Sequence, residues 1–284
     1  RVFVTGSTDG IGRRTATDLV TAGHEVVLHG RTPARAVEAM AAVPGAAGSL
    51  VGDLASMAET RALAEAATHA GPFDVVIHNA GIGGGAPERV LTEDGLERIF
   101  QVNALAPYLL TALMPRPRRL VYLTSGLEAD GVMDLDDLQY RRRPWNGMQA
   151  YSDSKLHDVV LAFAVARLWP EVRSNAVDPG WIRTKLGGPA ATDDLPEGAE
   201  TQVWLAVGDD PAAVAANRAR PSSVSAWAAI AASTLARPAS VDIARAIWAD
   251  WCSSELSVVV VQPAGPCAAP RPPARGASGP SSVS

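Results

Sequence analysis

Short apolar runs alternate with amphipathic helical patterns from the first residue to about residue 177, and this alternation constrains the fold most strongly. We predict strands at residues 1–5, 25–29, 49–52, 75–78, 120–124 and 173–177. Predicted helices cover residues 11–22, 33–43, 57–69, 93–113, 149–169 and 201–207. Repeated strand–helix units imply a parallel sheet with helices on both faces. The sequence therefore predicts a single α/β domain built on a doubly wound parallel sheet.

A glycine-rich turn, Thr5-Gly-Ser-Thr-Asp-Gly-Ile-Gly12, joins the first strand to the first helix. Backbone N–H groups of such a turn, together with the helix N-terminus, can hold a pyrophosphate. Its glycines allow a tight turn and close ligand approach, although their spacing departs from the usual dinucleotide fingerprint. We predict a Rossmann-type cofactor site, with an ordinary glycine-rich turn as the alternative; its candidate residues are Gly6, Ser7, Gly10, Ile11 and Gly12.

The end of the second strand indicates which cofactor is bound. An acidic residue at this place would hold the ribose hydroxyls of NAD, but the chain has His29-Gly30-Arg31. An arginine there can pair with a 2'-phosphate. We therefore expect NADP(H), held by Arg31 with Ser7 or Arg13 as further candidates; a solvated loop arginine is the alternative.

Tyr151 and Lys155 lie four residues apart in the longest predicted helix, so their side chains share one face. A fixed positive charge beside a phenol favours the phenolate form. The pair could therefore exchange a proton with a reacting oxygen, although tyrosine and lysine at this spacing also occur on solvated helix faces.

These motifs, taken in order, resemble the short-chain dehydrogenase/reductase family over nearly all of residues 1–190. The resemblance implies a catalytic tetrad of Asn103, Ser125, Tyr151 and Lys155. It also implies cofactor contacts from residues that follow the third, fourth and sixth strands: Asp53, Leu54, Asn79, Ala80, Gly81, Pro179, Gly180 and Thr184, with Lys155 holding the nicotinamide ribose. Taken singly, several of these residues could instead be caps or turn residues.

The resemblance implies an NADP(H)-dependent oxidoreductase that transfers hydride between nicotinamide and a carbonyl or secondary alcohol. Ser125 would bind the substrate oxygen, Tyr151 would act as general acid or base, and Asn103 would position a water that relays protons to Lys155. A non-catalytic NADP(H)-binding redox regulator is the alternative, and a sugar-nucleotide epimerase is a third reading. The intact tetrad favours the enzyme.

The 26 positions between Ser125 and Tyr151 exceed the usual family spacing and resemble the branch of retinol dehydrogenases and protochlorophyllide reductase. The latter is disfavoured because its cysteine has no counterpart before Cys252. We expect residues 126–146 to form a flap beside the substrate cleft, or a solvated charged loop. Trp145 and Trp181 could line an apolar pocket or pack in the core. The loop from Trp181 to Gly188 resembles bacterial ketone reductases.

Composition limits which partners the protein can bind and in which compartment it is expected. A net charge of −5 gives no electrostatic footprint for nucleic acid or an anionic membrane, and no apolar run is long enough to span a bilayer. Cys252 and Cys267 provide neither a disulfide framework nor a metal-ligand spacing, which fits the cytoplasm. Because the chain starts at Arg1 inside a predicted strand, we expect no signal peptide and a few missing native residues. We expect a small-molecule substrate, and the helix that carries Tyr151 would permit a homodimer.

The domain that resembles the family ends at about residue 210. Residues 211–284 are rich in alanine, serine, proline and arginine, and residues from about 264 are predicted to be disordered, with a further strand at 256–261. We hypothesise that this atypical C-terminal region arises from a frameshift.

Overall fold

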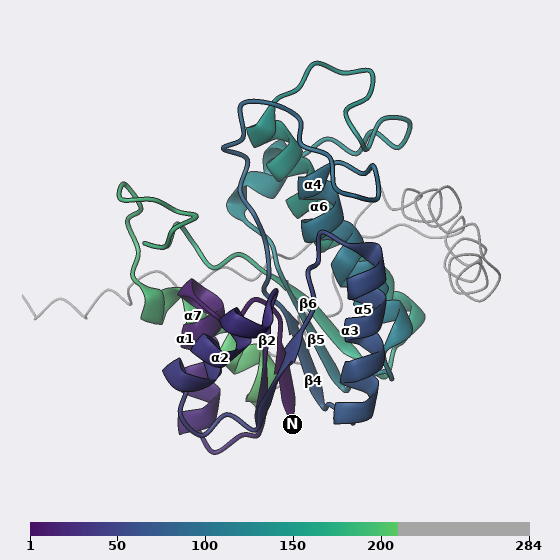
Figure 1. Cartoon of the computed structure of the whole chain (residues 1–284). Coiled ribbons are helices and arrows are strands. Elements are labelled where there is room, and N and C mark those ends of the chain that lie inside the picture. Colours follow the sequence, from purple (N-terminus) through teal and green to yellow (C-terminus); the bar gives the residue numbers. More distant parts are fainter. Residues whose placement is uncertain (210–284) are drawn as a thin grey trace, which may run out of the picture.

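The computed structural model describes residues 1–209, which form an α/β fold with one six-stranded parallel sheet (Figure 1). The strands are β1 (Val2–Val4), β2 (Val26–Gly30), β3 (Gly48–Val51), β4 (Val75–His78), β5 (Arg119–Leu123) and β6 (Arg173–Val177). Their order in the sheet is β3-β2-β1-β4-β5-β6. The predicted doubly wound fold is confirmed.

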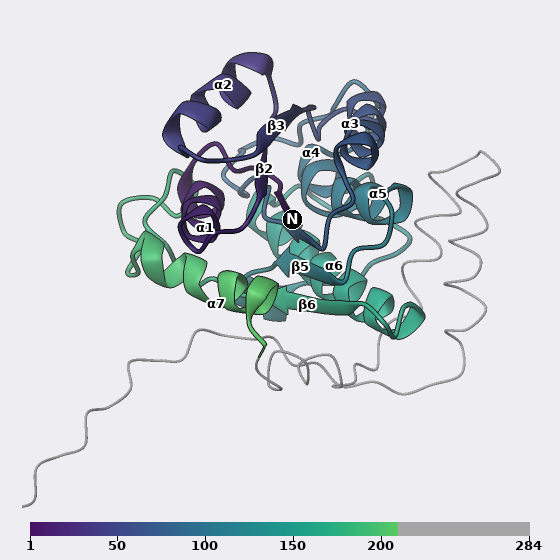
Figure 2. The same cartoon turned by 90° about the horizontal axis from the view of Figure 1, so that it is seen from below.

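Helices cover both faces of the sheet (Figure 2). On one face lie α1 (Gly10–Thr21), α2 (Pro33–Ala42) and α7 (Leu195–Val207). On the other lie α3 (Met57–Ala70), α5 (Ala106–Leu113) and α6 (Gly147–Leu168), with short turns α4 (Arg98–Phe100) and η1 (Gln101–Leu105) leading into α5. A 3₁₀ turn, η2 (Gly126–Asp130), follows β5.

Two apolar layers separate the sheet from its helices, because successive strand residues face opposite sides. In β1, Phe3 packs toward the layer shared with α3, α5 and α6, whereas Val2 and Val4 pack toward α1 and α7. These strand residues are almost completely buried. Burial on both faces explains why β1 is a continuous apolar run rather than an alternating one.

The order of the strands reverses beside β1, whose two neighbours are β2 and β4. Loops after β1 and after β4 leave the sheet on opposite faces at this point, and a crevice opens between them at the carboxyl ends of the strands. The fold thus brings the glycine-rich turn next to the residues that follow β4.

Two helices begin several residues away from their predicted starts. The helix predicted at 93–113 begins only at Arg98, because Gly95 adopts a left-handed φ of 71° and the Glu97 carboxylate caps the first turn through the N–H groups of Ile99 and Phe100. The last helix begins at Leu195 rather than residue 201, after a capping box of Asp194 and Glu197.

The predicted strand at 256–261 and the proposed frameshifted region 211–284, with its disorder from 264, lie outside the described residues. Within residues 1–209, no helix is both long and apolar enough to cross a membrane. No group of three metal-ligating side chains is arranged to hold an ion in that part of the chain.

Candidate active site

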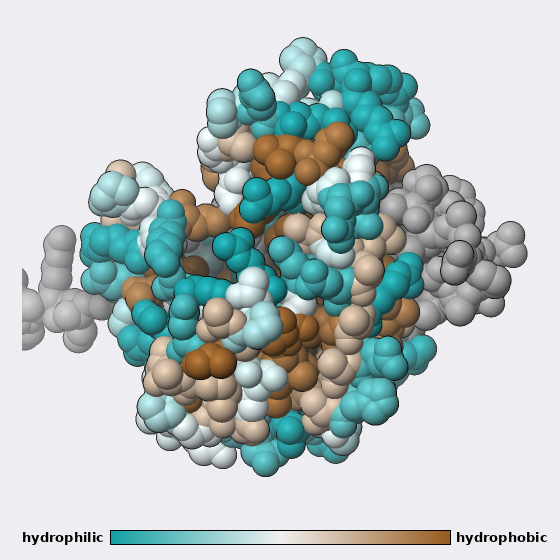
Figure 3. All heavy atoms as spheres, viewed as in Figure 1, coloured by the Kyte–Doolittle hydropathy of each residue, from teal (hydrophilic) through white to brown (hydrophobic). Residues whose placement is uncertain are grey.

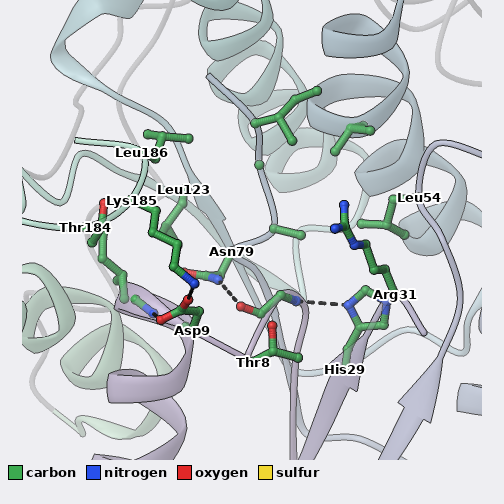
Figure 4. A pocket seen from close by; sticks show the side chains of 18 of the residues that line it. Thr8, Asp9, His29, Arg31, Leu54, Asn79, Leu123, Thr184, Lys185 and Leu186 are labelled. Carbon is green, nitrogen blue, oxygen red and sulfur yellow. Dashed lines mark hydrogen bonds and ion pairs between the residues drawn. The ribbon is translucent and has the colours of Figure 1, made fainter. Parts of the chain in front are cut away.

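A cavity of about 710 Å³ opens at the carboxyl ends of the strands. Figure 3 shows it as a hollow in the molecular surface, and Figure 4 shows the side chains around it. Most of the site residues predicted from the sequence line this one cavity: Gly6, Gly10, Ile11, Gly12, Arg31, Asp53, Leu54, Asn79, Ala80, Gly81, Tyr151, Lys155, Pro179 and Thr184. Ser7, Asn103, Ser125 and Gly180 do not line it.

The glycine-rich turn needs its glycines for close packing. Gly6 and Gly10 adopt φ angles of 63° and 52°, which are left-handed values. A Cβ atom on Gly12 would lie 2.2 Å from Nδ2 of Asn79. Asn79 donates from this nitrogen to the carbonyl oxygens of Thr5 and Gly6, so it fastens the turn to the end of β4. Asn79 therefore has a structural role at the predicted cofactor site.

Ser7 is buried within the turn rather than directed into the cavity. Its hydroxyl oxygen accepts a hydrogen bond of 2.8 Å from the backbone N–H of His29. The His29 ring accepts from the Gly6 N–H through Nδ1, and its Nε2 lies 2.9 Å from the carbonyl oxygen of Gly52. Burial lowers the pKa of His29. Ser7 and His29 thus join the segments at the ends of β1, β2 and β3 beneath the site. Arg13, the other candidate for binding a 2'-phosphate, does not line the cavity.

Two arginines line the cavity beyond the end of β2. Arg31 extends from the strand end toward Leu54 (Figure 4). Arg35, in the first turn of α2, donates to the Thr8 hydroxyl at 2.9 Å. Neither Arg35 nor Thr8 was predicted from the sequence. Its place in the first turn of the predicted helix 33–43, just beyond the carboxyl end of a strand, could have indicated Arg35.

The loop after β6 closes the cavity on the side opposite Arg31 (Figure 4). Thr184 contacts the turn beside Gly10, and Lys185 forms an ion pair with Asp9, the N-cap of α1. The hydrogen bond from Lys185 is the main reason that the pKa of Asp9 is lowered, and the capping N–H of Gly10 also lowers it. Lys185 thereby neutralises a carboxylate at the place where an anionic ligand would bind.

Tyr151 and Lys155 lie together on the cavity wall, as predicted. The Lys155 ammonium lies 5.8 Å from the centre of the Tyr151 ring. Its Nζ donates to the carbonyl oxygen of Leu123 at 2.7 Å and to Oδ2 of Asp158 at 2.9 Å. Burial opposes the charge on Lys155, but Asp158, with a smaller effect of Tyr151, outweighs it and raises the pKa of Lys155.

Asn103 lies beneath the cavity in the π-helical turn η1, an irregularity that is frequent at functional sites. Its side chain exchanges two hydrogen bonds with the backbone of Ile82, at 2.8 and 3.0 Å, and donates to the Ser154 hydroxyl. A Cβ atom on Gly81 would lie 3.5 Å from Oδ1 of Asn103 and 3.6 Å from Nζ of Lys155. Asn103 therefore lies close to the lysine but is fully buried.

Comparisons with known proteins agree with this geometry. Residues 1–118 match the family model for short chain dehydrogenase. An uncharacterized oxidoreductase of Emericella nidulans is 46% identical over 211 residues, which cover 73% of this chain and 80% of the relative. The chain belongs to the short-chain dehydrogenase family.

Further relatives of the short-chain dehydrogenase family have more specific names. Short-chain dehydrogenase chyC of Penicillium rubens is 45% identical, with 74% of this chain and 81% of the relative covered. DnrU of Streptomyces sp., whose name refers to a daunorubicin C-13 ketoreductase, is 36% identical, with 72% and 77% covered. The crystal structure of an uncharacterized protein from Mycobacterium Paratuberculosis has a TM-score of 0.67 and 27% identity, covering 87% of this chain and 90% of that one.

Ser125, which resembles the catalytic serine of the short-chain dehydrogenase family, lies just after β5. Ser125 caps the turn η2, and its hydroxyl oxygen accepts from the Leu127 N–H at 3.3 Å. It follows Thr124, which lines the cavity, but it is not itself among the lining residues. Its contact with a substrate oxygen stays a prediction.

The segment between Ser125 and Tyr151 is fastened to the helix that carries this short-chain dehydrogenase's tyrosine and lysine. The Asp137 carboxylate accepts the backbone N–H groups of Arg141, Arg142 and Arg143. Arg143 pairs with Asp153 of α6 at 3.1 Å, and the Tyr140 hydroxyl donates to the same carboxylate. These contacts, most of them partly buried, brace residues 126–146 against α6 as a wall, although many residues of the segment are exposed.

The two tryptophans have different surroundings. Trp145 packs edge-on against Tyr140 and lines a small second cavity of about 140 Å³ beside Ile82. Trp181 is 52% exposed, and its indole N–H donates to the carbonyl oxygen of Gly187. Neither lines the main cavity, so their predicted contact with substrate stays open.

Proposed function

We propose that this short-chain dehydrogenase uses NADP(H) to interconvert a carbonyl compound and a secondary alcohol. One observation carries the proposal: a single cavity contains a phosphate-binding turn, two arginines at the end of β2, and the Tyr151–Lys155 pair. A cofactor bound along the cavity would thus extend from the arginines to the tyrosine. DnrU, a relative named for a ketoreductase, supports a carbonyl substrate.

The residues present fit NADP(H). The first turn of α1 offers backbone N–H groups to a pyrophosphate, and Gly6 and Gly10 add no side chains there, although the Asp9 carboxylate accepts the N–H of Gly10. Arg31 and Arg35 would hold a 2'-phosphate through charge-assisted hydrogen bonds. Asp53 and Leu54 would border the adenine, while Pro179 and Thr184 would border the nicotinamide. When bound, the cofactor supplies or accepts the hydride.

Tyr151 would give its hydroxyl proton to the substrate oxygen during reduction and take it back during oxidation. Lys155 would stabilise the phenolate by its charge and donate to the cofactor's ribose. Ser125 would bind the substrate oxygen, and Asn103 would hold the backbone of Ile82 and a relay water near Lys155. In the cytoplasm, where NADPH is kept reduced, the enzyme would act mainly as a reductase. A homodimer through α6 stays a prediction; residues 159–165 of this helix are already buried in the single chain.

Fluorescence titration with NADPH, combined with NADPH oxidation in the presence of a panel of ketones and aldehydes, tests the proposal. Binding with turnover would support the enzyme. Binding without turnover on any carbonyl compound would favour the non-catalytic regulator, and absence of binding would contradict both.

A further inference from the structure

Lys155 has a buried acidic neighbour on its own helix. Asp158 lies one turn after Lys155 in α6, and the two side chains are 6% and 4% exposed. The distance from Nζ of Lys155 to Oδ2 of Asp158 is 2.9 Å, which is a charge-assisted hydrogen bond. A buried charge without a partner strongly favours its neutral form. The carboxylate therefore supplies the counterion that a protonated lysine needs at this depth.

The hydrogen bonds of the ammonium group also fix its direction. An ammonium has three N–H donors, and Lys155 uses one on the Leu123 carbonyl and one on Asp158. Lys155 lines the main cavity, whereas Asp158 does not. The third donor is thus left for the cavity side, where Tyr151 also lies.

Few other ionisable groups affect the pKa values of Lys155 and Asp158. Burial raises the pKa of Asp158 to about 6, and Lys155 opposes that rise. Tyr122 of β5 faces Asp158, and its own pKa is raised by burial and, to a smaller extent, by this carboxylate. Other ionisable side chains on the described elements that pack against α6 do not contribute to the pKa of Asp158: Arg98, Arg119, Glu128, Asp130 and Arg173.

We propose that Asp158 is a positioning residue that keeps the Lys155 ammonium charged and directed into the cavity. This role rests on the proposed function of Lys155, because the charge on that lysine is what acts on Tyr151 and on the ribose. Asp158 itself touches neither the cavity nor, by this account, the substrate.

The chain allows a direct test, because its sequence contains only two lysines, Lys155 and Lys185. Labelling lysine with ¹³C at Cε gives two NMR signals, and Lys185→Arg removes one while retaining the charge beside Asp9. The full chain with this replacement is titrated with and without Asp158→Asn. We expect the titration midpoint of Lys155 to fall by about one pH unit or more in the Asp158→Asn protein, because an opposite charge at this range favours the ammonium.

A matched control removes another buried carboxylate from the same helix. Asp153 is as buried as Asp158 but pairs with Arg143 of the 126–146 wall. Asp153→Asn should leave the Lys155 midpoint unchanged. An unchanged midpoint in Asp158→Asn as well would overturn the proposal. If Asp158→Asn does not fold, the protein with native Asp158 still decides the matter: the Lys155 signal should show a second, smaller step on the acid side of the lysine midpoint, where Asp158 ionises. A single step would contradict it.

The pH profile separates positioning from a merely structural role. The alkaline limb of kcat/KM for ketone reduction should move in Asp158→Asn, because the charge on Lys155 affects the pH at which Tyr151 loses the proton that it gives to the substrate. A structural role would lower kcat or thermal stability without moving that limb, and would refute the proposal. If the protein with native Asp158 neither binds nor oxidises NADPH, the proposed function fails, while the lysine midpoint still tests the role of Asp158.

Discussion

Lys185 forms an ion pair with Asp9 although 176 positions separate them in the sequence. The contact joins the loop after β6 to the N-cap of α1, at the turn where a pyrophosphate would bind. Without Lys185, the Asp9 carboxylate would repel that anion. Because the pair is solvent-exposed, its effect should be modest.

We therefore predict that Lys185→Ala raises the Kd for NADPH about two- to five-fold. Fluorescence titration at low and high salt measures the effect, which should shrink as salt screens the repulsion. Adding Asp9→Asn, which keeps the helix cap, should restore most of the affinity. Equal loss of affinity in the single and double variants would show that Asp9 is not the reason.

Arg35 and Arg31 should determine the preference for NADPH over NADH. We expect Arg35→Ala to weaken NADPH binding about tenfold, because a hydrogen bond to a charged group contributes about 1.5–3 kcal/mol. NADH binding should change little, and Arg31→Asp should move the preference toward NADH. Arg14, which pairs with Asp18 on α1 and does not line the cavity, provides the control substitution Arg14→Ala. Unchanged NADPH affinity in the Arg31 and Arg35 variants would remove the 2'-phosphate assignment.

Gly12→Ala should destabilise the protein and impair NADPH binding. The added methyl carbon would lie 2.2 Å from Nδ2 of Asn79 and 2.5 Å from the Gly6 carbonyl oxygen, so the turn must shift. Such overpacking costs about 1–3 kcal/mol, measurable as a lower Tm. Gly85→Ala is the control, because no atom lies within 4 Å of its added carbon. A Tm for Gly12→Ala equal to that of Gly85→Ala would refute this packing account.

Acid should destabilise the fold through buried histidines. Burial lowers the pKa of His78 to about 3, and its Nε2 lies 3.1 Å from the Thr111 hydroxyl. Because this folded-state pKa lies below the unfolded value of about 6.5, His78 contributes stability above pH 6.5 that is lost as the pH falls toward 3.

At pH 5 this loss should be about 2 kcal/mol from His78 alone. Denaturant unfolding at pH 7.5 and pH 5 should therefore show a smaller pH-dependent loss in His78→Asn than in the protein that retains His78. Burial raises the pKa of Asp158, so this residue has the opposite effect on the pH dependence of stability. Its effect is the same in both proteins and cancels when they are compared. An identical pH dependence would show that His78 does not become charged on unfolding.

Local periodicity and glycine positions predicted the parallel sheet and the order of its helices, whereas cavity-lining residues such as Asp53, Asn79 and Thr184 were implied by the resemblance to the short-chain dehydrogenase/reductase family. Where the predicted helix starts were wrong, local backbone and capping contacts decided. Gly95 and the buried carboxylate of Glu97 delay the start of the helix predicted at residue 93. The start of α7 was predictable, since Asp194 and Glu197 have the spacing of a capping box.

The contacts that surround the reactive pair were less accessible to sequence reasoning. Helical spacing places Asp158 near Lys155, but only the packed structure shows that both are buried. The Lys185–Asp9 pair joins distant segments, so no local pattern indicates it. The wall at residues 126–146 depends on Asp137 and Asp153, whose partners are brought together by an irregular loop.

Tyr151→Phe tests the central claim most directly, because it removes one hydroxyl from the cavity and leaves the ring. NADPH affinity and the oxidation of NADPH with an accepted ketone are measured in the same preparation. We predict that the Kd for NADPH stays within about threefold, while kcat falls by about 10²-fold or more, as expected for loss of a general acid. A variant that binds NADPH and retains full turnover would contradict the assignment of Tyr151 as the proton donor.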